Sequence, residues 1–86
     1  MISSKGLRVY PNPTHGFVRM DWDPTDKKAQ GIRVLSLNGE EVHKARVSSV
    51  DSFCEMSLPD LVPGMYFLAL DHTTGTEYQK IIVTSP

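Results

Sequence analysis

Apolar and polar positions alternate in short runs along most of this chain, and Gly or Pro separates many of the runs. In the clearest run, Val18, Met20 and Trp22 alternate with Arg19 and Asp21, which is the period of two expected of a strand with one buried face. Seven segments of this kind lie at residues 7–10, 18–22, 32–37, 40–47, 54–58, 65–70 and 76–84. The pattern predicts an all-β fold, an antiparallel immunoglobulin-like β-sandwich of about seven short strands with Greek-key connections.

Two segments depart from simple alternation. Residues 32–37 carry apolar side chains on both sides, which indicates either burial on both faces or a β-bulge. Residues 65–70 are apolar throughout and predict a central strand buried on both faces.

Turn signals separate the segments. Asn38-Gly39 tolerates the positive φ angles of a type I′ turn and predicts a tight hairpin. Pro63-Gly64 suits the centre of a type II turn. Tyr66 then lies where immunoglobulin-like folds often place a corner tyrosine, whose hydroxyl bonds back to the preceding loop.

Residues 40–58 contain neither Gly nor Pro, and several of their apolar side chains lie roughly on one helical face. The polar run at residues 48–52 opposes a helix, because short polar side chains compete for backbone hydrogen bonds. We interpret residues 48–52 as a turn between two strands.

Composition narrows the choice of function. The chain has 86 residues, enough for one small core, and its net charge of -1 supplies no positive surface for nucleic acid or an anionic membrane. Its longest apolar run is six residues, far short of the roughly 20 that a membrane-spanning helix needs. Cys54 is the single cysteine; it is in phase with Met56 and Leu58 and is interpreted as an inert buried thiol.

Reactive side chains form no recognisable catalytic or metal motif. His15, His43 and His72 lack the spacing of metal ligands and are interpreted as surface histidines. Nothing resembles the Gly-x-Ser-x-Gly turn of a serine nucleophile. We therefore expect no enzyme activity, no catalytic residue, no metal and no cofactor.

Two binding hypotheses remain from the residues alone. Asp21, Asp23 and Asp26 could attract calcium, although the neighbouring lysines favour a solvated loop. Tyr10 and Tyr78 could stack on sugar rings. Trp22 could do so too, but it alternates in phase with the apolar positions and is better explained as core.

The order of the motifs resembles the C-terminal sorting domain of the type IX, or Por, secretion system of Bacteroidetes. The resemblance is carried by residues 9–16 (Val-Tyr-Pro-Asn-Pro-Thr-His-Gly), 32–39, 61–68 and 80–83. The positions that match the family pattern are Pro11, Asn12, Pro13, Gly16, Asn38, Gly39, Leu61, Gly64, Tyr66, Lys80, Ile81, Ile82 and Val83. It implies that residues 7–86 form the sorting domain and residues 1–6 a linker or an expression remnant.

The resemblance also implies a role and partners. The domain would direct a covalently linked upstream cargo through the periplasm and across the outer membrane, by way of the translocation machinery. A sortase-like peptidase would then remove it at the cell surface, leaving the cargo released or joined to lipopolysaccharide. Because residues 1–6 lack the apolar core of a signal peptide, we expect that signal at the start of a longer precursor.

The surface that is read is expected to include the last strand, residues 78–83, where the backbone would present an edge. The alternative is an ordinary core strand with one snorkelling lysine, Lys80. An open edge would also permit two copies to pair. A function of another class, an immunoglobulin-like accessory or carbohydrate-binding module of a surface enzyme or adhesin, fits the same sandwich pattern.

Overall fold

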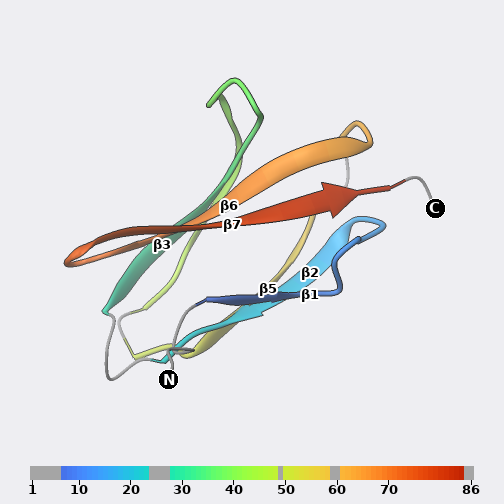
Figure 1. Cartoon of the computed structure of the whole chain (residues 1–86). Helices are drawn as coiled ribbons and strands as arrows, with labels where there is room; N and C mark the ends of the chain where they lie inside the picture. The colour runs from blue at the N-terminus through green and yellow to red at the C-terminus, as the bar shows by residue number, and fades with distance from the viewer. Residues whose placement is uncertain (1–6, 24–27, 49, 59–60, 85–86) are drawn as a thin grey trace, which may run out of the picture.

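Two antiparallel sheets packed face to face make up the structure, a computed structural model that describes residues 7–23, 28–48, 50–58 and 61–84 (Figure 1). The described residues form seven strands and no helix. One sheet has the order β1-β2-β5, with β1 at Arg8–Tyr10, β2 at Phe17–Asp21 and β5 at Phe53–Ser57. The other has the order β4-β3-β6-β7, with β3 at Ala29–Leu35, β4 at Glu41–Arg46, β6 at Gly64–His72 and β7 at Gly75–Val83.

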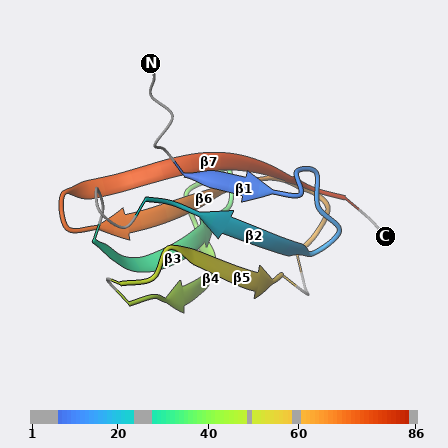
Figure 2. The same cartoon turned by 90° about the horizontal axis from the view of Figure 1, so that it is seen from below.

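The chain crosses between the sheets three times, after β2, β4 and β5. As a result β2 pairs with β5 and β3 with β6, although neither pair is consecutive in sequence. Figure 2 shows the three-stranded sheet in front of the four-stranded one. The predicted immunoglobulin-like sandwich is therefore confirmed, and β1 lies at the edge of its sheet.

The core lies between the sheets and is built from the alternating positions. Its most deeply buried large side chains are Val18, Met20, Ile32, Val34, Leu68, Leu70 and Ile81. Trp22 is 6% exposed and belongs to this core, as its phase predicted. Cys54 is half-buried against it rather than fully buried as predicted, and this burial raises the pKa of its thiol.

The expectation that residues 65–70 are buried on both faces is wrong for half of the segment. β6 is central, between β3 and β7, but only Leu68, Ala69 and Leu70 are buried, whereas Met65 is 40% exposed. The reason is that a two-layer sandwich leaves the outer face of each sheet toward solvent. In β3 the structure has the bulge, with a register shift between Val34 and Leu35.

The β3–β4 hairpin exists, but its turn is not type I′. Gly39 has a φ of 85°, while no described non-glycine residue has a positive φ, so Asn38 does not adopt the angle that type I′ requires. The Gly39 N–H donates to the Ser36 carbonyl (2.9 Å), and the Ser36 N–H donates to the Glu40 carbonyl (2.8 Å). These bonds define a three-residue loop that ends in a left-handed glycine, the next commonest hairpin connection.

The corner before β6 also differs from the type II prediction. Gly64 has a φ of 156° and already pairs with Val83 as a strand residue, whereas the third residue of a type II turn has a φ of about 80°. The corner tyrosine is confirmed, because the Tyr66 hydroxyl donates to the Val62 carbonyl at 2.6 Å. The turn after β4 is confirmed as well, with the Asp51 N–H donating to the Ser48 carbonyl at 3.0 Å.

Candidate functional site: the edge of the last strand

The connection between β1 and β2 lies against the C-terminal end of β7 (Figure 1). We call residues 11–14 the strap. Thr14 pairs in parallel with Val83. The Thr14 N–H donates to the Ile82 carbonyl, and the Thr84 N–H donates to the Thr14 carbonyl, both at 2.8 Å. The strap therefore makes one parallel β-bridge with the edge of the four-stranded sheet.

Asn12 extends this pairing through its side chain. Its amide nitrogen donates to the Lys80 carbonyl (3.1 Å), and its amide oxygen accepts the Ile82 N–H (3.0 Å). An asparagine amide carries a donor and an acceptor in the arrangement of a peptide group. Asn12 thus satisfies two groups of the β7 edge that another strand would otherwise satisfy.

Thr14 holds the strap in shape. It is 1% exposed, and its hydroxyl accepts the N–H groups of Gly16 (3.1 Å) and Phe17 (3.0 Å) while donating to the Phe17 carbonyl. The sequence reasoning assigned Thr14 no role. The available signal was a threonine directly after Pro-Asn-Pro, because threonine hydroxyls often stabilise turns by bonding nearby backbone groups.

Thr84, just after β7, completes the contact. Its hydroxyl donates to the Thr14 carbonyl at 3.3 Å and lies 2.9 Å from Nδ1 of His15. The segment that follows the matching residues 80–83 therefore participates in the same hydrogen-bond cluster as the strap.

Most of the sequence-predicted site residues converge on the C-terminal half of β7. The strap contains Pro11, Asn12 and Pro13 and borders one side of that half. On its other side β6 pairs Gly64 with Val83 and Tyr66 with Ile81. Away from this cluster, Asn38 and Gly39 lie in the β3–β4 hairpin, and Leu61 packs against the core.

β7 presents its side chains alternately to the core and to the outer face of its sheet. Ile81 and Val83 are buried, whereas Lys80 is exposed and Ile82 is 39% exposed. The strand is thus a core strand on one face and a sheet edge along its backbone, so both sequence interpretations describe part of it. On the outer face a hollow of about 430 Å³ is lined by Leu35, Ser36, Leu37, Gly39, Phe67 and Tyr78.

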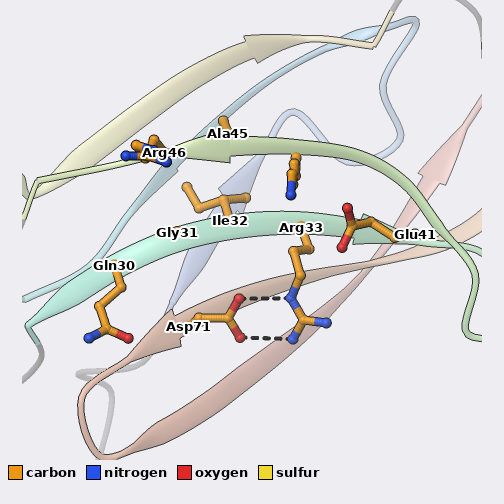
Figure 3. A pocket seen from close by; sticks show the side chains of 9 residues that line it. Gln30, Gly31, Ile32, Arg33, Glu41, Ala45, Arg46 and Asp71 are labelled. Carbon is orange, nitrogen blue, oxygen red and sulfur yellow. Dashed lines mark hydrogen bonds and ion pairs between the residues drawn. The ribbon is translucent and has the colours of Figure 1, made fainter.

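A second outer-face hollow, on β3, β4 and β6, contains an ion pair (Figure 3). Arg33 binds Asp71 through two hydrogen bonds, of 2.7 Å from Nε and 2.8 Å from Nη2, and Thr76 adds a third at 2.8 Å. The hydrogen bonds from Arg33 and Thr76, with the charges of Arg33 and His72, outweigh partial burial and lower the pKa of Asp71. Both oxygens of the Asp71 carboxylate accept hydrogen bonds from within the domain. We therefore interpret the Arg33–Asp71 ion pair as structural.

The other candidate residues do not form a site in the described part of the chain. No three His, Cys, Asp or Glu side chains gather there, and Asp26 lies outside the described residues. Burial raises the pKa of Asp21, but hydrogen bonds from Tyr10 and Arg8 outweigh it, and the net pKa is lowered. Tyr10 is 42% exposed, with its hydroxyl 2.7 Å from Asp21 Oδ2. The described residues also include no helix of the length and apolarity needed to cross a membrane.

Comparison with known proteins identifies a family for this chain. The family model described as "Secretion system C-terminal sorting domain" matches residues 8–84. A search of curated proteins finds no match. The matched region begins with β1, includes the strap, and ends at Thr84 beside it. The chain belongs to the family of C-terminal sorting domains of the type IX, or Por, secretion system.

Proposed function

We propose that this domain delivers an upstream cargo through the periplasm and across the outer membrane, and that the translocation machinery reads the edge and outer face of β7. Family membership supports the role of a secretion signal for a secreted or cell-surface protein. The observation that carries the assignment of the surface is the strap. It joins the residue 9–16 motif to the residue 80–83 motif through Asn12 and Thr14.

The described residues give this role a physical basis. β7 is an edge strand, and such strands present main-chain groups to which another chain can bind. The side chains on its outer face, among them Lys80 and Ile82, are exposed. Recognition of this strand needs no catalytic group in the domain. Removal at the cell surface by a sortase-like peptidase, with release of the cargo or its transfer to lipopolysaccharide, belongs to the same proposal.

Delivery of a reporter tests this function. Residues 7–86 are fused to the C-terminus of a periplasmic reporter in a Bacteroidetes host that has the secretion system, and surface reporter is measured by its accessibility to added protease. We expect surface delivery by the intact fusion and its loss when residues 78–86 are deleted. A reporter that stays in the periplasm with the intact domain would overturn the proposal. Delivery that survives the deletion would show that β7 is not read.

A further inference from the structure

The strap covers only the C-terminal half of the β7 edge. β6 pairs in register with β7 over its whole length, from Gly64 opposite Val83 to His72 opposite Gly75. In an antiparallel ladder the backbone groups of successive residues point alternately toward and away from the partner strand. Lys80, Ile82 and Thr84 direct backbone groups away from β6, because these groups bond to the strap. Thr76 and Tyr78 have the same parity and therefore direct their N–H and C=O groups outward.

The two halves of this edge consequently differ. Within the described residues, the contacts of the strap with the β7 backbone reach back as far as the Lys80 carbonyl. On the N-terminal side of that carbonyl, the Lys80 N–H and the N–H and C=O groups of Tyr78 and Thr76 point away from β6 along the same edge of β7. The strap shows that this edge accepts added main-chain pairing, and the row from Thr76 to Lys80 is the direct continuation of that interface.

Side chains beside residues 76–80, the part of β7 beyond the strap, are suited to contact with a second chain. Tyr78 is 59% exposed and forms one wall of the outer-face hollow, together with Leu35, Leu37 and Phe67. The opposite edge of the same sheet, β4, carries exposed Glu41, Lys44 and Arg46, and charged edge strands discourage pairing. Residues 76–80 of β7 carry one exposed charged side chain, Lys80, against three on β4, so of the two edges this part of β7 is the better site for strand addition.

We propose that an extended segment of the translocation machinery adds as a strand to β7 at residues 76–80, beside the strap, and places an apolar side chain against Tyr78. This inference rests on the proposed function and specifies how the same edge is read. Main-chain hydrogen bonds would supply the affinity, and the contact with the Tyr78 side chain would supply the specificity, as in other strand-addition complexes.

Proline substitution at outward-facing positions tests the backbone pairing. Tyr78→Pro and Thr76→Pro each remove an N–H that does not bond to β6, and proline is tolerated on edge strands and near strand starts. Each proline variant is compared with a valine variant at the same position: Thr76→Val also lacks the hydroxyl bond to Asp71 but retains the N–H, and Tyr78→Val also lacks the ring but retains the N–H. Each variant is fused to the reporter in the secreting host, and thermal unfolding of the purified domain shows which variants retain the fold.

We expect both proline variants that fold to lose surface delivery by about tenfold or more relative to the valine variant at the same position, since each lost main-chain bond also prevents close approach of the added strand. If a folded proline variant is delivered as well as a valine control that is itself delivered, strand addition is wrong, although the sorting function stands. If the unmodified fusion fails, the sorting function itself is wrong. A concentration-dependent dimer of the purified domain that Tyr78→Pro abolishes would assign this edge to a second copy and overturn the proposal.

Discussion

Asn12 acts as a strand residue although it lies in a turn between two strands. Its amide satisfies the Lys80 carbonyl and the Ile82 N–H, about the number of bonds that one strand residue contributes to a ladder. Thr14 continues the pairing through its backbone. At the scale of single residues, Asn12 and Thr14 of the Pro-Asn-Pro-Thr motif are therefore explained by what they bind.

Replacing the Asn12 amide should loosen the end of β7. Asn12→Ala removes both bonds, and we expect a loss of about 1–2 kcal/mol in the free energy of unfolding, because each net hydrogen bond contributes about 0.5–1.5 kcal/mol. Asn12→Asp keeps the acceptor for the Ile82 N–H but loses the donor to Lys80, so it should show a smaller loss at neutral pH. Chemical denaturation measures both. Equal stability of Asn12→Ala and the unmodified chain would show that the side-chain pairing contributes nothing.

At the scale of elements, the outer face of the four-stranded sheet is divided between an apolar end and a polar end. The apolar end surrounds Tyr78 and Phe67. At the polar end, Arg33 of β3 binds Asp71 of β6, which also accepts a bond from Thr76 of β7. One carboxylate thereby connects three neighbouring strands.

This connection should make stability depend on pH. Because the folded-state pKa of Asp71 is lowered, chiefly by hydrogen bonds from Arg33, its contribution is fully present above the ordinary aspartate pKa of about 4 and is lost as the pH falls through the lowered value. The melting temperature of the unmodified domain should therefore exceed that of Asp71→Asn at pH 7, and the difference should shrink in acid. The difference should also shrink with added salt, since both side chains are about 30% exposed. A gap that is independent of pH would contradict this account.

The sequence predicted these elements better than their connections. Strict alternation located β2, because burial of one face imposes a period of two. It overstated the burial of β6, since an apolar run does not reveal that Met65 lies on an uncovered face. The turn at Gly39 was placed but assigned the wrong type, because both candidate hairpin loops require a glycine there and only the loop length separates them.

At the scale of the whole molecule, the motifs that are far apart in sequence collect around the end of the last strand. The strap and the start of β6 border the C-terminal half of β7 from its two sides. The sequence identified β7 as a recognition candidate but did not reveal the strap. Bonds between a side chain and a backbone nearly 70 residues away have no periodic signature.

If the edge and outer face of β7 are the recognised surface, reversing a charge on β7 should reduce surface delivery of the reporter, whereas reversing a charge on β4 should not. Lys80 and Lys44 are both exposed, on opposite edge strands of the same sheet. We expect Lys80→Glu to reduce surface delivery of the reporter several-fold and Lys44→Glu to leave it nearly unchanged, since surface substitutions seldom alter stability by more than about 0.5 kcal/mol. Protease accessibility of the reporter measures both variants. Equal delivery of the two variants would show that recognition does not depend on the charge of Lys80.

The strap also makes the edge of β7 depend on folding of the whole domain. The bonds from Asn12 to Lys80 and Ile82 span 68 and 70 positions of an 86-residue sequence, and contacts that close so long a loop carry a large entropic cost before they form. An unfolded or truncated chain therefore leaves the Ile82 amide open to water, whereas the finished fold shields it. Hydrogen exchange at that single amide distinguishes a mature domain from an immature one.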